Sequence, residues 1–227
     1  MISAILTCAG NGCRFGHDKL KKMLAGKPVF IRTVEQFAKA KNIDEIIIAI
    51  RKDEFPYYQK WLKKEKIKAK LVEGGKERYL SAYNGVSASS GDYVIIHDGD
   101  RPLIQVKLIE KVCAEIKKSP AVILAVETHT CIKKIEKGSV IKCYPRAETW
   151  LGQTPQAFKK DIIVKAYENA IKNNEKVSTD DCELVHRLGI VNKMIPGDHF
   201  NIKITIPADL VIVRELYKFF NKGGKNV

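Results

Sequence analysis

The stretch that decides the fold is ISAILTC at residues 2–8, together with the loop AGNGCRFGHDKLKK that follows it at residues 9–22. The first run is short and apolar, and it predicts a buried first strand. The loop contains three glycines, which let backbone N–H groups approach a ligand closely. Its arginine and three lysines place positive charge beside these amides, which suits a polyphosphate. We therefore expect this loop to hold a nucleoside triphosphate, and an ordinary glycine-rich strand-to-helix loop is the alternative.

Two well-known phosphate-binding motifs do not fit this loop. A Walker loop needs a glycine and a lysine at its sixth and seventh positions, but the sixth residue from Gly10 is Phe15. A dinucleotide fingerprint needs a third glycine and an acidic residue after the second strand. Arg51 and Lys52 follow the second apolar run, which ends at Ile50. A nicotinamide-dependent oxidoreductase is therefore a disfavoured alternative.

The composition indicates an anionic partner. The chain has 227 residues, 45% of them hydrophobic, and a formal net charge of +14. Such a surplus suits phosphorylated small molecules, nucleic acid or a membrane surface. No recognised nucleic-acid motif is present, many lysines have the spacing of a solvated helix face, and no apolar run approaches 18 residues. We expect no nucleic acid and no membrane partner, and a non-catalytic nucleotide- or nucleic-acid-binding module is the third hypothesis.

The six cysteines form no C-x-x-C pair, so a zinc site is not expected. Their scatter is typical of reduced, mostly buried thiols. Together with the lack of a signal-peptide pattern, this predicts a cytoplasmic protein.

Strand and helix patterns alternate over the first 125 residues, which predicts an α/β fold with a mostly parallel sheet and helices on both faces. The pattern then changes: residues 130–134 and 139–143 predict a β-hairpin, part of an arm at about 127–150. Beyond it we expect a polar turn at 153–156, a helix capped by residues 178–181 and a short strand at 201–205. No linker is evident, so residues 1–227 are expected to form one domain.

Charged residues cluster after the apolar run at 93–96, in HDGDRP at 97–102. In an open α/β sheet the ligand sits beyond the carboxyl ends of the strands. Asp98 suits a Mg²⁺ that accompanies nucleotide phosphates, and Arg101 suits a phosphate group. We expect His97 to be a buried structural group rather than an acid–base catalyst. A salt-bridged turn is the alternative interpretation of this segment.

A second glycine-rich turn lies in EGGKERYLSAYNG at 73–85. Gly74 and Gly75 precede a helix that is expected to begin near Lys76, and the amides of a helix N-terminus favour ligand contact. Arg78 and Ser81 lie three residues apart on one face of this helix. A plain strand–turn–helix junction remains the alternative.

The order of these motifs resembles the 2-C-methyl-D-erythritol 4-phosphate cytidylyltransferases of the non-mevalonate isoprenoid pathway. Ribitol 5-phosphate cytidylyltransferases share their architecture. The resemblance is carried by AGNGCRFG with Lys21, GGKERYLSAYNG, HDGDRP, Arg146 with Trp150, QTPQAF and NIKIT. It implies a Rossmann-like three-layer nucleotidyltransferase domain with a mostly parallel sheet and a protruding β-hairpin arm. The implied reaction is Mg²⁺-dependent transfer of CMP from CTP to a polyol phosphate, with methylerythritol phosphate ahead of ribitol phosphate as the acceptor.

The resemblance also implies the roles of individual residues. The catalytic cations would be Arg14, Lys21 and Lys203. The nucleotide would be bound by Ala9, Gly10, Asn11, Gly12, Gly74, Gly75, Ser81, Asp98 and Gly99, with Asp98 also binding the metal. The acceptor would be bound by Arg101, Thr130, Arg146 and Thr154, with Thr128 as the alternative threonine of the arm. The arm would reach across a homodimer to the acceptor pocket of the neighbouring subunit.

The chain departs from the family pattern at several positions. Leu20 and Lys22 flank Lys21 where proline and glutamine are usual, and Gly99 and Asp100 stand where the family commonly has two small apolar residues. Asp100 adds negative charge near the expected acceptor side, and its role is left open by the sequence.

Overall fold

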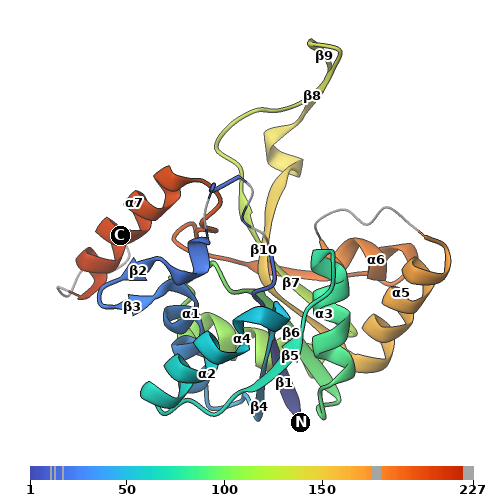
Figure 1. Ribbon diagram of the computed structural model, residues 1–227. Coiled ribbons are helices and arrows are strands. Elements are labelled where there is room, and N and C mark those ends of the chain that lie inside the picture. Colours follow the sequence, from blue (N-terminus) through green and yellow to red (C-terminus); the bar gives the residue numbers. More distant parts are fainter. Residues whose placement is uncertain (11, 13, 17, 175–179, 222–227) are drawn as a thin grey trace.

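A seven-stranded sheet forms the centre of the protein (Figure 1). The structure is a computed structural model that describes residues 1–10, 12, 14–16, 18–174 and 180–221. The strand order is β11-β7-β10-β6-β1-β4-β5. In that order the strands are Lys193–Pro196, Ala121–Glu127, Trp150–Lys159, Tyr93–Asp98, Ile2–Thr7, Glu45–Ile50 and Lys70–Glu73.

The first strand, β1, lies inside the sheet, where it pairs in parallel with both β4 and β6. Ile5 lies opposite Ile47 on one side and Ile96 on the other, and all three side chains are fully buried. A strand covered on both faces is expected to be almost continuously apolar. This explains the run at residues 2–8 and confirms the predicted first strand.

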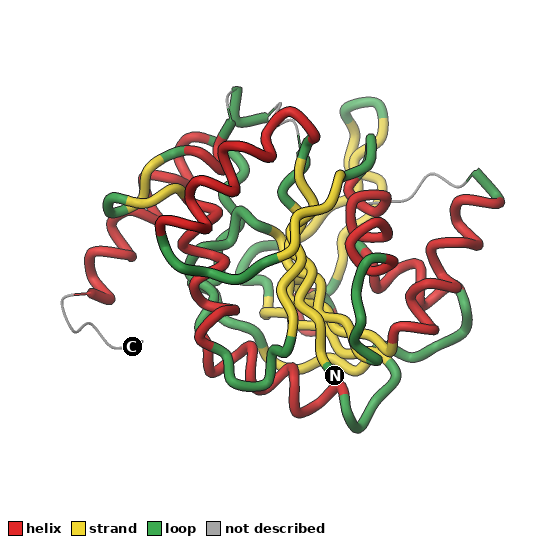
Figure 2. Tube along the Cα trace, turned by 60° about the horizontal axis from the view of Figure 1, so that its bottom comes forward, coloured by secondary structure: helices red, strands yellow, loops and turns green. Residues whose placement is uncertain are grey.

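Helices cover both faces of the sheet (Figure 2), as the alternating pattern predicted. They are α1 Val29–Lys39, α2 Phe55–Lys64, α3 Arg78–Ser87, α4 Val106–Ile116, α5 Lys160–Lys172, α6 Asp181–Arg187 and α7 Pro207–Asn221. Successive strand residues point to opposite faces, so Ile48 packs in a core with α1, α2, α4 and α7, whereas Ile47 packs in a core with α3, α5 and α6. The three-layer α/β architecture is confirmed.

The predicted hairpin is also confirmed. Strands β8 Ile132–Glu136 and β9 Ser139–Tyr144 pair only with each other among the described residues and project from the main body (Figure 1). Apolar side chains on it are exposed: Ile135 (55%), Val140 (52%) and Ile141 (47%). A smaller hairpin, β2 Met23–Leu24 with β3 Lys27–Pro28, follows the glycine-rich loop and was not predicted.

The predicted polar turn at 153–156 is wrong. These residues belong to β10, the strand that runs antiparallel between β6 and β7. Proline in a central strand normally argues against the assignment because it cannot donate to the ladder. Here the register with β7 shifts between Gln153 and Gln156, so Pro155 sits in an irregularity where that donor is not needed.

Two further predictions concern the C-terminal part of the chain. The strand expected at 201–205 is wrong: this segment lies outside the sheet and is tied to the turn after β6 by one backbone bond, Ile204 N–H to the carbonyl of Asp100 at 2.9 Å. The cap of α6 is confirmed for Asp180, whose carboxylate accepts from the Cys182 amide. Residues 178 and 179 lie outside the described residues. None of the described helices has the length and apolar character required to cross a membrane.

Candidate functional site

A cavity of about 510 Å³ opens where β1, β4, β5 and β6 end. Parallel strands bring their carboxyl ends to one edge, and ligands of open α/β sheets bind there. The lining residues come from the loop after β1, the turns after the other three strands, and the segment after residue 200. They are Thr7, Ala9, Gly10, Gly12, Arg14, Lys19, Leu20, Arg51, Lys52, Glu73, Gly74, Gly75, Lys76, Glu77, Arg78, Ser81, Asp98, Asp100, Lys203 and Thr205.

The structure brings most of the residues predicted for the nucleotide and for catalysis to this cavity. Those that line it are Ala9, Gly10, Gly12, Arg14, Gly74, Gly75, Ser81, Asp98 and Lys203. Asn11 lies outside the described residues. The remaining predicted residues, Lys21, Gly99, Arg101, Thr130, Arg146 and Thr154, do not line it.

Lys21 points toward carboxylates outside the cavity. Its ammonium pairs with Glu54, whose side chain is 4% exposed, and with Asp18 at 2.9 Å. Burial would lower the pKa of Lys21, but the hydrogen bonds to Glu54 and Asp18 outweigh it and raise the pKa. The neighbouring Lys19 lines the cavity instead. The sequence did not single out Lys19, because two lysines that lie two residues apart in an irregular loop give no indication of which side chain points into the cavity.

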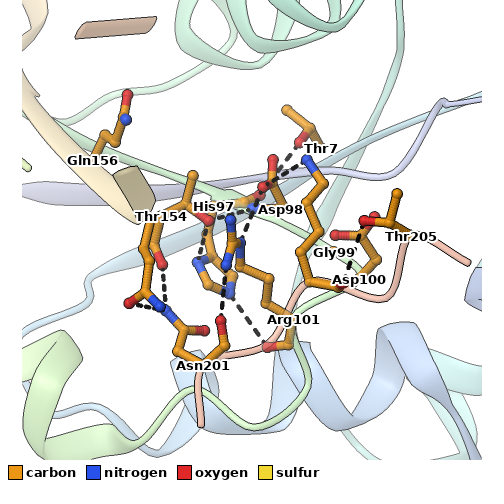
Figure 3. A network of polar contacts seen from close by, with 12 residues as sticks. Thr7, His97, Asp98, Gly99, Asp100, Arg101, Thr154, Gln156, Asn201 and Thr205 are labelled. Carbon is orange, nitrogen blue, oxygen red and sulfur yellow. Dashed lines mark hydrogen bonds and ion pairs between the residues drawn. The ribbon is translucent and has the colours of Figure 1, made fainter. Parts of the chain in front are cut away.

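Asp98 is the centre of the charge network in the site (Figure 3). Its Oδ1 accepts from Arg78 Nε at 2.9 Å, and its Oδ2 accepts from Lys203 Nζ at 2.9 Å and Arg101 Nε at 3.2 Å. Burial would raise the pKa of this carboxyl group. The positive charges of Arg78, Lys203 and Arg101 outweigh that effect and hold the pKa well below its usual range. Asp98 is therefore ionised at any pH near neutrality.

Arg78, in α3, extends this network to α6, which covers the same face of the sheet. Its Nη1 donates to Asp181 Oδ2 at 2.7 Å, and Asp181 is fully buried. Tyr167 donates its hydroxyl hydrogen to the other oxygen of Asp181 at 2.8 Å. Neither Arg78 nor Asp181 was among the predicted site residues. The position of Arg78 in the first turn of the helix after the Gly74–Gly75 turn was the available signal for it, whereas nothing in the sequence pairs it with a residue 103 positions away.

His97 and Thr154 form a buried chain of hydrogen bonds beside Asp98 (Figure 3). The Asp98 amide donates to Thr154 Oγ1 at 3.1 Å, and Thr154 Oγ1 lies 3.0 Å from His97 Nδ1. His97 Nε2 faces the carbonyl of Arg101 at 3.4 Å. A neutral ring protonated at Nε2 satisfies every member of this chain, with the threonine hydroxyl donating to Nδ1. Burial lowers the pKa of His97 from 6.5 to about 3, so the ring is a structural group, as expected.

Close backbone approach explains the glycines. A side chain at Gly74 would collide with the Cβ of Ala9, so the first loop and the turn after β5 meet only because residue 74 is glycine. At Gly99 a side chain would collide with the sulfur of Cys8 and approach the carbonyl of Thr7. The Gly99 amide donates to that carbonyl at 3.0 Å. Gly99 thus packs β6 against β1, and the structure does not bring it to the cavity.

The residues predicted for the acceptor lie in two places. Thr154 and Arg101 are buried beside Asp98, and Arg101 Nη1 donates to the Asn201 carbonyl at 2.8 Å. Thr130 and Arg146 are exposed on the arm, with Arg146 in a short 3-10 helix, Arg146–Glu148. Thr128 is buried and donates to the Thr130 carbonyl at 2.9 Å, so of the two arm threonines it is Thr130 that is open to solvent.

Asp98 is a suitable protein ligand for a divalent cation here. No group of three or more His, Cys, Asp and Glu side chains that could hold a metal ion occurs among the described residues. Asp98 Oδ1 accepts the Arg78 bond, and a carboxylate oxygen has a second lone pair. Because Mg²⁺ bound to nucleotide phosphates needs few protein ligands and keeps several waters, Asp98 fits as one ligand or as an acceptor for a bound water.

The cavity is suited to a polyanion. Seven arginines and lysines line it against four carboxylates. No histidine stands beside a hydroxyl or thiol among the described lining residues, so the lining offers no nucleophile–base pair. The chemistry that such a site supports is binding and neutralisation of phosphate groups.

Comparisons with known proteins agree with this chemistry. The family model described as IspD, 2-C-methyl-D-erythritol 4-phosphate cytidylyltransferase, matches residues 2–217. The enzyme of that name from Bacillus mycoides (strain KBAB4) is 36% identical over 217 residues, which cover 93% of this chain and 96% of the relative. That of Clostridioides difficile (strain 630) is 37% identical over 232 residues, with 100% and 98% covered. The crystal structure of 4-diphosphocytidyl-2C-methyl-D-erythritol synthase from Anaerococcus prevotii DSM 20548 matches with a TM-score of 0.86 at 32% identity, covering 96% of this chain and 98% of that one.

Because His97 is buried and neutral, we expect the free energy of unfolding to fall in mild acid. Below pH 6.5 the unfolded chain protonates this ring, whereas the folded chain does so only near pH 3, so stability falls as the pH drops through that window. At pH 5 the loss from this group is about 2 kcal/mol. Urea unfolding between pH 7 and pH 5 measures it. In His97→Gln the free energy of unfolding should fall less between pH 7 and pH 5 than in the wild type. An equal fall in the two proteins would contradict the assignment of His97 as a buried neutral ring.

Proposed function

Because the chain belongs to the 2-C-methyl-D-erythritol 4-phosphate cytidylyltransferase family, we propose that its cavity binds CTP and transfers CMP to 2-C-methyl-D-erythritol 4-phosphate. The products are the CDP-polyol and pyrophosphate, a step in non-mevalonate isoprenoid precursor synthesis. The observation that carries this proposal is the cation-rich cavity around Asp98, in a chain that matches these enzymes over nearly its whole length. A cytoplasmic location suits an enzyme that consumes CTP.

The reaction needs no nucleophile from the protein. An oxygen of the acceptor phosphate attacks the α-phosphorus of CTP, a new P–O bond forms, and the bond between the α-phosphorus and the bridging oxygen breaks. Pyrophosphate leaves with the electron pair of that bond. Since the acceptor phosphate is already ionised at neutral pH, the protein contributes alignment and neutralisation of the developing negative charge.

Each part of the cavity has a role in this scheme. The amides of Gly10 and Gly12, with the Arg14 side chain, would receive the triphosphate, since consecutive glycine-rich amides bind anions. Gly74, Gly75 and Ser81 would contact the nucleoside. The Ser81 hydroxyl accepts from the Gly75 amide at 3.0 Å, which fixes the shape of that turn.

Lys203 is proposed as the cation at the reacting phosphorus. Its ammonium lies 2.9 Å from Asp98 Oδ2, so the segment at 201–205 places a positive charge beside a residue proposed to bind the nucleotide. Arg101 and Thr154 would act by holding Asp98 and its neighbours, because both are buried behind it.

We propose for Lys19 the catalytic role that the resemblance implies for Lys21. Lys19 lines the cavity, whereas Lys21 neutralises the buried carboxylate of Glu54. Lys19 also pairs with a buried carboxylate, that of Asp100, but Asp100 lines the cavity, so Lys19 can meet a phosphate there beside its partner. Lys21 would have to leave Glu54, and breaking a buried pair is costly.

Mg²⁺ is proposed as the metal cofactor, held by the nucleotide phosphates and Asp98. When bound, it would neutralise part of the phosphate charge. The chain's own cations, Arg14, Lys19 and Lys203, would do the same for the remaining oxygens.

The arm is proposed to form a homodimer and to bring Arg146 and Thr130 to the acceptor site of the neighbouring subunit. Support comes from its exposed apolar residues, since an isolated two-stranded hairpin is marginally stable and exposed apolar patches mark interfaces. Arg146 does not line the cavity of its own chain.

Pyrophosphate release tests the reaction directly. With CTP and Mg²⁺, we expect release with methylerythritol 4-phosphate and at least about a hundredfold lower kcat/KM with ribitol 5-phosphate, because a site that bonds specific substrate hydroxyls rejects analogues that place them differently. Chelation of Mg²⁺ by EDTA should abolish release. Turnover of ribitol 5-phosphate alone would overturn the acceptor assignment.

A pair of lysine variants tests the role of Lys19. Lys19→Met should lower kcat by about a hundredfold or more, as for loss of a charge contact in the transition state. Lys21→Met is the matched control in the same 3-10 helix, Lys19–Lys21. It should lower the melting temperature, because Glu54 loses one of its two cationic partners and keeps only Arg51, and change kcat by less than about tenfold. A larger loss of kcat in Lys21→Met than in Lys19→Met would assign the catalytic role to Lys21 instead.

Mixing two inactive variants tests the arm. If Arg146 serves the neighbouring subunit, a heterodimer of Arg146→Ala and Lys19→Met chains has one site with both defects and one intact site. Refolding the two chains together should then restore roughly a quarter of the wild-type activity. Mixing Arg14→Ala with Lys19→Met is the control that should restore nothing, since both residues line the same cavity. No recovery with Arg146→Ala would refute the action across the dimer.

A further inference from the structure

Asp100 has a place in the site that the proposed reaction leaves unexplained. Its Oδ2 lies 2.5 Å from the ammonium of Lys19, and the two side chains are only 9% and 14% exposed. Both residues line the cavity. The pair joins the loop after β1 to the turn after β6 at the position where the nucleotide phosphates are proposed to bind.

A third segment closes this contact into a ring. Lys19 Nζ also donates to the carbonyl of Ile204 at 2.7 Å, and the amide of Ile204 donates to the carbonyl of Asp100 at 2.9 Å. Ile204 follows Lys203, whose ammonium pairs with Asp98. Side chain and backbone of Asp100 therefore hold both Lys19 and the segment that carries Lys203.

The second oxygen of the carboxylate is poorly accommodated. Asp100 Oδ1 is buried and has no hydrogen-bond partner. A buried acceptor without a partner costs about 1–3 kcal/mol, and more when it is charged. Such groups in folded proteins call for a reason other than stability. We take that reason to be the contact that the other oxygen of Asp100 makes with Lys19.

We propose that Asp100 is a positioning residue for CMP transfer: its carboxylate fixes the ammonium of Lys19 and ties the nucleotide-binding loop to the segment bearing Lys203. The inference deepens the proposed function and rests on it for the role of Lys19. The glycines that let this loop approach phosphates also leave it conformationally free. A lysine side chain in such a loop loses much entropy when it is ordered, and a fixed partner reduces that loss on substrate binding.

A double-mutant cycle tests the proposal. Asp100→Asn keeps the shape of the side chain and removes its charge. In the wild-type background it should lower kcat/KM for CTP by about tenfold and raise the Kd for CTP by about fivefold, because residues in direct contact couple and a misplaced group costs rate. In the Lys19→Met background the same change should alter either quantity by less than about twofold, since Asp100 acts through Lys19.

Other roles give other outcomes. If Asp100 only repels the nucleotide, Asp100→Asn tightens CTP in both backgrounds. If it binds the metal or the acceptor directly, the loss is equal in both backgrounds. Either result overturns the proposal, as does an unchanged Asp100→Asn enzyme. Asp100→Glu, which keeps the charge, should recover more than half of the loss in logarithmic kcat/KM.

Two controls complete the design. Glu73→Gln removes another negative charge from the cavity lining, and its effect should be the same in the wild-type and Lys19→Met backgrounds, since Lys19 pairs with Asp100. Calorimetric binding of CTP needs no turnover, so the cycle can be measured even if methylerythritol 4-phosphate is not the acceptor. Failure of that acceptor would then refute the proposed function alone. Should Asp100→Asn not fold, Asp100→Ser replaces it in the cycle.

Discussion

The site depends on one constraint, the burial of the ionised Asp98 carboxylate at the end of β6. A buried carboxylate is tolerated only when it is paired, and Asp98 receives Arg78, Arg101 and Lys203 from three separate parts of the chain. Each of these cations is held by a different element, so the ion pairs fix helix α3, the turn after β6 and the segment at 201–205 relative to one another. The positions of Arg78, Arg101 and Lys203 are thus set by their pairing with one carboxylate.

The parallel sheet explains why that charge stands at a cavity. Strands β4, β1 and β6 pair in parallel, and their carboxyl ends together with that of β5 form one edge. The loops leaving this edge carry the glycines and the cations. Gly74 lets the turn after β5 approach Ala9, so this wall of the cavity is backbone in close contact, and Gly99 lets the end of β6 pack against Cys8 behind it. Glycine-rich backbone and seven long cationic side chains line the cavity and outnumber its four carboxylates, an arrangement suited to neutralising phosphate charge without a protein nucleophile.

The two lysines of one 3-10 turn pair with different carboxylates. Lys21 is committed to Glu54 and Asp18, whereas Lys19 is held at the cavity by Asp100 and a carbonyl. The same division holds for the histidine and aspartate of HDGDRP: His97 stays neutral inside the protein, and Asp98 stays charged beside it. In both cases, residues close together in the sequence have different surroundings because their side chains point in different directions.

The sequence by itself determined the strands of the parallel sheet, the hairpin arm, the glycine-rich loops and the family, because these depend on local patterns: apolar β-branched runs, turn residues and short motifs. Only the tertiary structure decided which groups meet. It placed Gln153–Gln156 in a central strand, because a register shift tolerates Pro155 there, and it left residues 201–205 outside the sheet. It chose Lys19 over Lys21 for the cavity and joined Arg78 to Asp181 across 103 positions of sequence. The physical reason is that ion pairs and strand registers are satisfied between distant segments, so no local pattern encodes them.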